Sequence, residues 1–458
     1  MQCHRFGQMQ FSKELMESQN LEIALLHHTG GGNFGDDATM DVVIANIRRR
    51  WPDAEITALS MNPSDTEERH GVPSLPLRRH RWSIGYGAGS HDSSSSPVSG
   101  WRCWLATSRN SLVRVPRAAF SELAFLISSF RTIRRFHMMI VSGGGQLTDR
   151  SGPWGYPYGI FLWTMMARVG GVPCRFLNVG AGPLHHPISK FLVARSLYAA
   201  EYVSFRDEPS QALARAVGYT GPSEVFPDSA YLLAAAHPAV GPARQEQIVV
   251  GVAPMFFPFC DPREHVGDHH TIYDEMIAKI GLFASELVRD GYQLALFGSD
   301  AGSDPACVED LRRILSARYG IETPPYTQVG SVTELLDCMA GMDFVVTCRF
   351  HGAVFAQLLN KPVLAIAHHP KVTTLMHSLG LSDYCVDIQT FDPTDLLKRF
   401  RSLVRCSKTV KRHLAASVAE NRKQLERQYD ALFPPTIGLG ISPGETSNES
   451  IPSIVARI

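Results

Sequence analysis

Short apolar segments alternate with longer helix-like segments along most of this chain, and the loops between them are rich in glycine or in charge. The first apolar segment, Glu22–Leu26, is followed by a Gly-rich loop and by a helix predicted from about Ala38 to Arg50. Further strands are predicted at Ile56–Leu59, Met138–Val141, Cys174–Val179, Tyr202–Phe205, Ile248–Ala253, Gln293–Phe297, Phe344–Val346 and Val363–Ala367. This alternation is typical of an α/β fold with a parallel, doubly wound sheet.

The length of the chain predicts more than one domain, because 458 residues exceed what a single hydrophobic core usually serves. A segment rich in Pro, Gly and polar residues at 235–247 separates two α/β series. We predict two Rossmann-like domains that face each other across a cleft, which is the natural place for a ligand. The predicted bounds are an N-terminal domain at 21–235 with a Ser-rich insertion near 80–117, a C-terminal domain at 246–405, a C-terminal helix at 406–433 and a disordered tail at 434–458.

The composition excludes several classes of protein. Lys+Arg and Asp+Glu are equal at 44 each, so no global field favours nucleic acid, and any anionic ligand must be held by local cations. The nine cysteines occur singly, which suits reduced thiols better than a disulfide scaffold or a zinc site. No apolar run resembles a signal peptide or is long enough to span a bilayer. We therefore expect a cytoplasmic protein.

Two Gly-rich loops follow predicted strands in the first half. In the loop at 30–37, the glycines let backbone N–H groups approach a ligand, and Asp36 and Asp37 suit the hydroxyl groups of a sugar. A tight turn in which these carboxylates cap the next helix is an equally weighted alternative. The loop at 142–149 contains Gly144 and Gly145 and is expected beside the first loop at the same sheet edge; close helix–sheet packing is its alternative.

Cations follow strands in both halves. Arg206 ends one strand, just before a helix that Asp207 can cap, and its planar guanidinium suits a carboxylate or a phosphate. In the second half, one strand runs into Arg349 and His351, and the next strand is followed by Lys371. The three cations could meet at one anion, with His351 as an acid or base near neutral pH.

These assignments have structural alternatives. Arg206 could instead form an internal ion pair with Asp207 or Asp228, and the cations of the two halves could point to different sides. Adjacent histidines occur at 27–28, 185–186, 269–270 and 368–369. Neighbouring side chains on a strand point to opposite faces, so such pairs rarely chelate one ion, and we predict no metal site.

Taken in order, these junctions resemble the motifs of the polysaccharide pyruvyl transferase family over roughly residues 21 to 400. The matching segments are G-G-N-F-G-D-D at 31–37, S-G-G-G at 142–145, V-G-A-G-P at 179–183, F-R-D-x-x-S at 205–210, P-D-S-A at 227–230, C-R-F-H-G at 348–352 and H-P-K-V at 369–372. The resemblance implies two Rossmann-like domains in a GT-B-like arrangement. It also implies a transferase that moves a pyruvyl group from phosphoenolpyruvate to a sugar of a polysaccharide or glycolipid precursor. The products are a pyruvate ketal and phosphate, and no cofactor or metal is expected.

The resemblance also assigns roles to particular residues. Arg206 and Arg349 match donor-binding cations and His351 matches an active-site histidine, and these three are the predicted catalytic residues. Phe350 stands where the family often has Leu, and His368 or His369 stands where the family has a tyrosine before the Pro-Lys step. The predicted substrate-binding residues are Asn33, Asp36, Asp37, Gly144, Gly145, Phe350 and Lys371.

Two other functions fit the same pattern: a nucleotide-sugar glycosyltransferase of GT-B fold, and a non-catalytic scaffold descended from such an enzyme. The predicted partners are phosphoenolpyruvate and a sugar acceptor, for which a lipid-linked sugar is one option. Nucleic acid is not expected, and the sequence does not disclose the oligomeric state. A basic stretch suits peripheral contact with the inner face of a membrane or, more simply, a solvated helix face. It comprises Arg114, Arg117, Arg131, Arg134 and Arg135.

Overall fold

The computed structural model describes residues 21–79, 120–233, 247–256, 269–324, 326 and 328–434. Its first half contains a sheet in which seven strands run parallel in the order β3-β2-β1-β4-β5-β6-β7. The strands are β1 (Glu22–His27), β2 (Glu55–Ser60), β3 (Ser74–Pro76), β4 (Met138–Ser142), β5 (Cys174–Val179), β6 (Tyr202–Phe205) and β7 (Glu224–Val225).

Helices cover both faces of this sheet. Alternate residues of β1 belong to two separate apolar clusters, with Ile23 and Leu25 in one and Ala24 and Leu26 in the other. Both faces are therefore buried, which explains why the strands have continuous apolar sequences. The helices of this half are α2 (Phe34–Arg50), α3 (Pro63–His70), a helix over residues 120–133, α5 (Tyr156–Gly170), α6 (Pro187–Ala199), α7 (Glu208–Ala216) and the short η1 (Ser229–Leu232).

The second half repeats the design with a smaller sheet of five parallel strands, in the order β12-β11-β10-β8-β9. The strands are β8 (Val249–Ala253), β9 (Gln293–Leu296), β10 (Phe344–Thr347), β11 (Val363–Ala367) and β12 (Cys385–Asp387). The helices are α8 (His269–Arg289), α9 (Asp304–Tyr319), α10 (Val332–Ala340), α11 (Phe350–Leu358), α12 (Pro370–Ser378), η3 (Ser382–Tyr384), α13 (Pro393–Arg405) and α14 (Ser407–Leu432).

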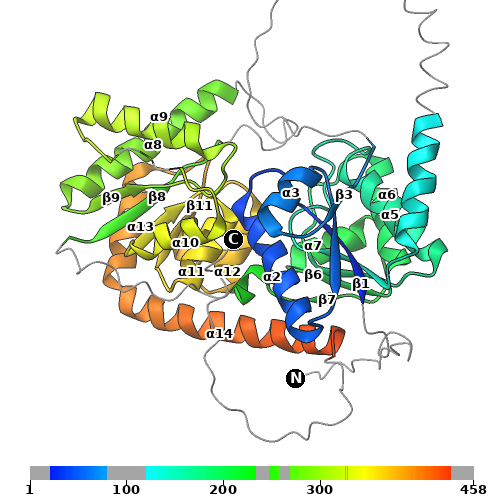
Figure 1. Cartoon of the computed structure of the whole chain (residues 1–458). Coiled ribbons are helices and arrows are strands. Elements are labelled where there is room, and N and C mark those ends of the chain that lie inside the picture. Colours follow the sequence, from blue (N-terminus) through cyan, green and yellow to red (C-terminus); the bar gives the residue numbers. More distant parts are fainter. Residues whose placement is uncertain are drawn as a thin grey trace, which may run out of the picture.

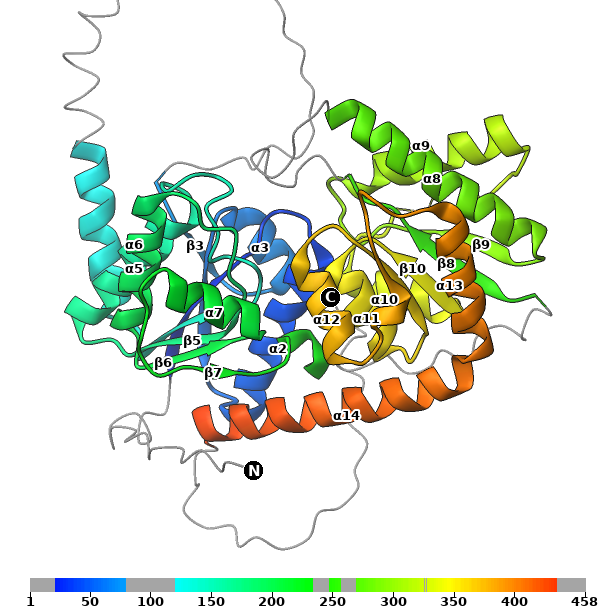
Figure 2. The same cartoon turned by 180° about the vertical axis from the view of Figure 1, so that it is seen from behind.

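The last helix, α14, ties the two halves together. It runs along one side of the molecule beneath both sheets (Figures 1 and 2). Its first turns, around Leu414, pack in the core of the second half, while Tyr429 packs in the core of the first. Near its end, the amides of Gln428 and Asn178 exchange two hydrogen bonds of 2.8 and 2.9 Å. These buried contacts fix how the two sheets face each other.

The start of α2 makes a second connection. Phe34 and Ala38 are buried in the apolar cluster of the second half, although they belong to the chain of the first. Burying a phenylalanine side chain stabilises a fold by roughly 1.5–3 kcal/mol. In addition, the Ala301 N–H donates to the Gly32 carbonyl at 2.8 Å. The loop after β1 is therefore held against the loop after β9.

The beginning of α2 corrects one interpretation of the sequence. The helix starts at Phe34, not near Ala38, and its cap is Asn33, whose side chain accepts from the backbone N–H groups of Gly35 and Asp36. The alternative in which Asp36 or Asp37 caps the helix was therefore wrong. Because both aspartates lie within the first turn, their side chains are available for other contacts.

Several predicted segments lie wholly or largely outside the described residues: the Ser-rich insertion near 80–117, the linker at 235–247, the tail at 434–458, and Arg114 and Arg117 of the basic stretch. The other arginines of that stretch, Arg131, Arg134 and Arg135, are exposed. Within the described ranges, no helix is both long enough and apolar enough to cross a membrane.

Candidate functional site

A small cavity lies between the two halves, where loops from the carboxyl ends of strands in both sheets meet. Its volume is about 180 Å³. The first half contributes loops that follow β1, β4, β5 and β6, and the second half contributes loops that follow β8, β9, β10 and β11. Arg206, Arg349, His351 and Lys371 all line it. The geometry expected from the sequence, with cations from both halves beside one imidazole, is therefore present in the structure.

Arg349 is held firmly within its own half. It occupies the N-cap position of α11, and its guanidinium donates to Asp304 Oδ1 at 2.5 and 3.1 Å and to Ser303 Oγ at 2.6 Å. Asp300 lies 3.4 Å away as a second carboxylate. Burial raises the pKa of the fully buried Asp304, and the charge of Arg349 offsets this only in part. Arg349 thus balances the charge of a buried carboxylate, and one side of the arginine lines the cavity.

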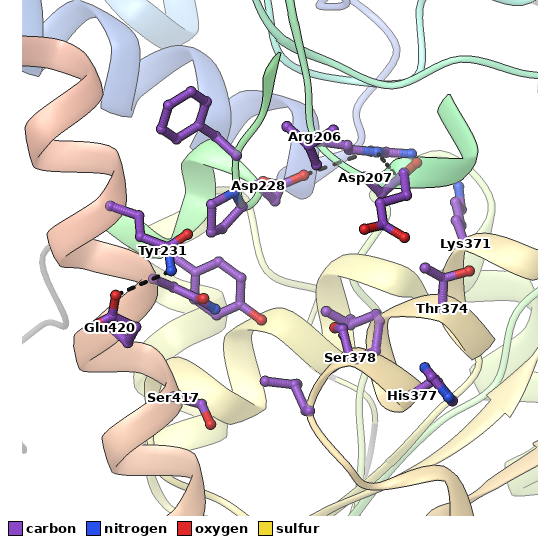
Figure 3. A pocket seen from close by; sticks show the side chains of 18 of the residues that line it. Arg206, Asp207, Asp228, Tyr231, Lys371, Thr374, His377, Ser378, Ser417 and Glu420 are labelled. Atoms are coloured by element: carbon purple, nitrogen blue, oxygen red, sulfur yellow. Dashed lines mark hydrogen bonds and ion pairs between the residues drawn. The ribbon is translucent and has the colours of Figure 1, made fainter. Parts of the chain in front are cut away.

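Arg206 is held across the boundary between the halves. Its Nε lies 3.3 Å from Asp207 and its Nη1 lies 3.7 Å from Asp228, so both of the ion pairs considered as alternatives are present (Figure 3). Its guanidinium carbon also stands 4.7 Å above the ring of Phe350, which belongs to the other half. Cation–π contact of this kind favours a fixed position over the ring. Ion pairing and cavity lining are therefore compatible for this residue.

His351 lies in the first turn of α11 and is largely buried. Its Nε2 has no hydrogen-bond partner among the described residues and stands 3.6 Å from Asp228 Oδ2. Burial would raise the pKa of Asp228, but His351 and Arg206 outweigh burial and hold it below its usual range. On its other side, His351 packs directly against Gly35, where a Cβ atom would overlap the imidazole. Gly35 is thus required for close approach of the two helix starts.

Two further cations line the cavity without a carboxylate partner among the described residues. Within the described part of the chain, neither the Lys371 ammonium nor the Arg150 guanidinium makes an ion pair or a hydrogen bond, and Lys371 only approaches the ring of Phe350, at 6.0 Å. Burial and the nearby charges of Arg206 and Arg150 lower the pKa of Lys371 to about 7. An anion in this cavity would relieve that repulsion.

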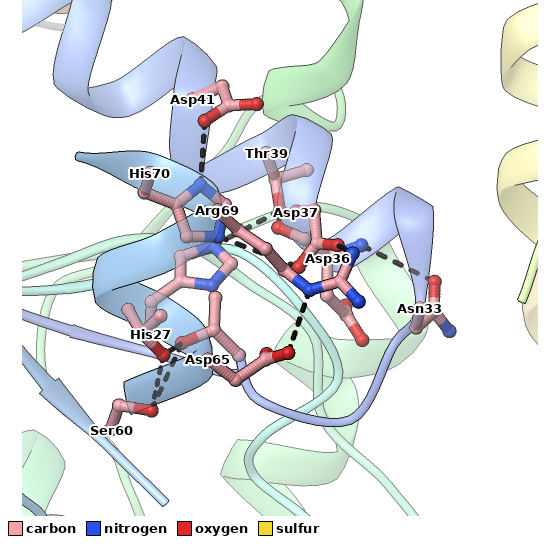
Figure 4. Close-up of polar contacts among 12 residues, drawn as sticks. His27, Asn33, Asp36, Asp37, Thr39, Asp41, Ser60, Asp65, Arg69 and His70 are labelled. Carbon is pink, nitrogen blue, oxygen red and sulfur yellow. Dashed lines mark hydrogen bonds and ion pairs between the residues drawn. The ribbon is translucent and has the colours of Figure 1, made fainter. Parts of the chain in front are cut away.

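The predicted residues of the first Gly-rich loop separate in the structure. Asn33 and Asp36 line the cavity, and Asp36 accepts from His28 Nδ1 at 2.9 Å. Burial opposes ionisation, yet His28 outweighs it and keeps the pKa of Asp36 well below its usual range. Asp37 points elsewhere, toward Arg69 and His70 (Figure 4), and burial raises its pKa despite those partners.

The two predicted glycines of the second Gly-rich loop also differ in position. Gly145 lines the cavity, whereas Gly144 does not. Gly144 has a φ of +59°, and a Cβ there would press on His28 and Asp36. Gly144 is therefore explained by close packing, the alternative considered above, and Gly145 by its position on the cavity wall.

The two histidines at the predicted tyrosine position have distinct structural contacts. His368 Nδ1 donates to the Cys348 carbonyl at 2.7 Å, and His369 Nδ1 accepts from the Lys371 N–H as the cap of α12. Burial and the charges of Lys371 and Arg150 lower the pKa of His369 to about 3, so it is neutral at physiological pH. Both line the cavity.

Residues that the sequence did not single out complete the site. Arg150 follows the second Gly-rich loop directly, so its place after a strand end was a usable signal. Asp228 was considered as a partner of Arg206 and belongs to the P-D-S-A segment, but it was assigned no role of its own; in the structure it lies between that arginine and His351. Asp300 follows a predicted strand end but was not singled out, and Asp304 gave no sequence signal, because the pairing of both with Arg349 arises only in the folded chain. Among the described residues, no group of three or more His, Cys, Asp or Glu side chains is arranged to hold a metal ion.

Comparison with known protein families identifies the chain. The model of the polysaccharide pyruvyl transferase family matches residues 33–370, which include every cavity-lining residue named above except His28 and Lys371. The chain belongs to this family. Its family is one of transferases that act on polysaccharides, so this coarse activity and the predicted family are both confirmed. No curated protein matches the chain.

Solved structures similar to this pyruvyl transferase family member confirm the predicted fold. HepE from Anabaena, solved in complex with UDP, is 12% identical with a TM-score of 0.53, over 90% of this chain and 100% of that one. UDP-GlcNAc 2-epimerase from Neisseria meningitidis, solved with UDP-GlcNAc, is 10% identical with a TM-score of 0.52, over 90% and 99%. At such low identity the likeness shows the fold alone, which is two-domain and GT-B-like.

Proposed function

We propose that this protein transfers a pyruvyl group from phosphoenolpyruvate to two hydroxyls of a sugar, forming a ketal and releasing phosphate. The observation that carries the proposal is that cations from both halves and His351 line the same small cavity. The donor would need no cofactor, and its acceptor would be a sugar unit of a polysaccharide or glycolipid precursor.

The charges of the cavity suit a small anion with two acidic groups. Arg206 and Arg349 are already balanced in part by aspartates, so they offer fixed donors more than excess charge. Lys371 and Arg150 supply the excess, because neither pairs with a carboxylate in the described chain. Phosphoenolpyruvate carries both a carboxylate and a phosphate, and a planar guanidinium recognises either group with two hydrogen bonds.

The chemistry requires proton transfers at defined points. A proton adds to the methylene carbon, a sugar hydroxyl attacks the adjacent carbon, the carbon–oxygen bond to phosphate breaks, and a second hydroxyl closes the ring. Of the two hydroxyl protons lost, one balances the proton gained by the methylene carbon and the other leaves with phosphate. His351 is the group placed to move a proton, and its Nε2 lies 3.6 Å from Asp228 Oδ2. The surrounding cations offset the charge that builds on the departing phosphate.

The test is phosphate release from phosphoenolpyruvate in the presence of a panel of glycosides. Wild-type protein should release phosphate with at least one glycoside, and His351→Ala and Arg349→Ala should each abolish the release. Arg405→Ala, a change of an exposed arginine at the end of α13, is the control and should behave as wild type. Consumption of a nucleotide sugar with no turnover of phosphoenolpyruvate would instead favour a glycosyltransferase. If neither phosphoenolpyruvate nor a nucleotide sugar is consumed, a non-catalytic scaffold would be favoured.

A further inference from the structure

A second and larger cavity adjoins the first. Its volume is about 740 Å³, and it opens between the start of α7, the loop after β7, helix α12 and helix α14 (Figure 3). The two cavities share Arg206, Asp207, Phe350 and Lys371 as lining residues. A ligand in the large cavity could therefore reach the same cations as a ligand in the small one.

The walls of the large cavity beyond the shared residues are rich in groups that bind hydroxyls. Helix α14 contributes Glu420, Asn421 and Gln424, and the Gln424 amide donates to Glu420 Oε1 at 3.2 Å. Helix α12 contributes the hydroxyls of Thr374 and Ser378. Carboxylates, amides and hydroxyls can each accept or exchange hydrogen bonds with sugar hydroxyls.

An apolar surface lies among these polar groups. Phe226 and Pro227, both half-buried, line the cavity, and Leu375 of α12 adds a further apolar side chain. Binding sites for organic ligands commonly combine apolar walls with a few well-placed polar groups. A sugar ring has the matching character, since its C–H faces are apolar while its rim carries hydroxyls.

Size and charge limit the choice of ligand. Ligand pockets typically enclose roughly 300–1,000 Å³, so the large cavity has room for a saccharide while the small one has room for only a compact anion. Beyond the shared Arg206 and Lys371, no lysine or arginine among the described residues lines the large cavity, whereas Glu208 and Glu420 do. These carboxylates would repel the diphosphate of a nucleotide sugar and favour an uncharged saccharide.

We infer that the large cavity is the binding site for the acceptor saccharide, whose reacting hydroxyls point past Phe350 toward the cations shared with the small cavity. This assignment rests on the proposed function, because it places the acceptor beside the phosphoenolpyruvate site. It gives α14 a role in substrate binding in addition to its structural one. The two substrates then approach the shared wall from opposite sides.

The test compares the same substitution at two adjacent positions. Ala416 and Ala415 are both exposed on α14, but only Ala416 lines the large cavity. In Ala416→Trp the indole should fill the cavity, while Ala415→Trp leaves it open and controls for the new side chain. Calorimetric titrations would use methyl glycosides of glucose, galactose, mannose and N-acetylglucosamine, with and without phosphoenolpyruvate. A separate titration with phosphoenolpyruvate alone reports on the small cavity.

We expect at least one glycoside to bind wild type and Ala415→Trp equally, and Ala416→Trp at least about tenfold more weakly. Phosphoenolpyruvate should bind all three proteins alike. The assignment would be overturned by equal glycoside affinity in the two variants or by the absence of any saturable glycoside binding. It would also be overturned if wild type bound a nucleotide sugar and Ala416→Trp lost that binding. Failure of phosphoenolpyruvate to bind wild type, with glycoside binding still lost in Ala416→Trp, would count against the proposed donor and leave the saccharide site standing.

Discussion

The two walls of the small cavity hold their arginines in different ways. On the C-terminal wall, Arg349 makes short hydrogen bonds to Asp304 and Ser303, all within one half of the molecule. On the N-terminal wall, Arg206 makes longer contacts with Asp207 and Asp228 and lies over Phe350 of the other half. The position of Arg349 is therefore set by its own domain, whereas that of Arg206 depends on how the two domains meet.

This difference suggests that the two arginines have different roles. A cation held by its own domain can bind an anion whether or not the second domain is correctly placed. Arg206, in contrast, stacks on the opposite domain and lies beside Asp228, which also lies near His351. Its position is therefore correct only when the two halves are correctly placed. Binding of the donor and assembly of the reacting groups would thus be separable, and the following variants are designed to separate them.

The largest effect should come from His351, where the two walls touch. His351→Asn keeps a polar side chain of similar size but cannot transfer a proton. We expect kcat to fall roughly 100- to 10,000-fold, as is typical for loss of a general acid or base, while the Kd for phosphoenolpyruvate changes little. Single-turnover kinetics and calorimetry would measure the two quantities. An equal loss in affinity and in kcat would show that His351 only binds substrate.

The next largest effect should be on stability, and it should differ between the arginines. Arg349→Ala leaves the fully buried Asp304 without its cation, which should lower the free energy of unfolding by roughly 3 kcal/mol, limited by protonation of the carboxyl. Arg206→Ala should cost about 1–2 kcal/mol, because its contacts are longer and Asp207 is less buried. Urea unfolding would measure both.

A double variant separates the structural role of Arg349 from its role in binding. Arg349→Ala/Asp304→Asn removes the buried charge together with its partner, so much of the lost stability should return. Affinity for phosphoenolpyruvate should remain low, because the cavity still lacks the guanidinium. Recovery of both properties would mean that Arg349 serves only to balance Asp304.

A smaller effect concerns pH. The pKa of Lys371 in the free protein is lowered to about 7, and a bound anion favours the charged ammonium. Affinity for phosphoenolpyruvate should therefore be greatest below pH 7 and should fall as the pH rises through 7, because the free lysine loses its proton. Lys371→Arg stays charged and should flatten this dependence in titrations from about pH 6 to 9. An unchanged pH profile would exclude Lys371 as the source.

The smallest effect should come from Arg150. It is exposed and has no ion-pair partner in the described chain, so Arg150→Ala should leave stability unchanged. It should weaken phosphoenolpyruvate binding by roughly three- to tenfold, and this loss should shrink at high salt. Arg405→Ala again serves as the control. Equal binding by the two variants would remove Arg150 from the site.

Local sequence patterns predicted the fold because short continuous apolar runs, longer segments of helical periodicity, and Gly-rich or charged loops can be told apart in the sequence. The same patterns placed Arg206 and Arg349 at strand ends, and parallel strands bring such ends to one edge. What could not be predicted is pairing between distant segments. The sequence around Asp304 contains no pattern that predicts its pairing with Arg349, which lies 45 residues away in sequence. Gly35 likewise looked like a loop residue, yet it is needed because His351 of the other half packs on it.

The split between Asp36 and Asp37 has a similar cause. Adjacent residues in a helix point about 100° apart, so one reaches the cavity and the other reaches Arg69 and His70. The prediction from sequence assigned both aspartates the same role because it placed them in a loop. Recognising Asn33 as the helix cap would have put both in the first turn and separated them.

The proposed function requires that cations from both halves hold one molecule of phosphoenolpyruvate. Calorimetric titration of wild type, Arg206→Ala and Arg349→Ala/Asp304→Asn tests it most directly, with Arg405→Ala as the control. We predict one saturable site per chain in wild type and in the control, and clearly weaker binding in both other variants. Unchanged binding after loss of either guanidinium, or no binding to wild type, would show that the two arginines do not hold phosphoenolpyruvate together.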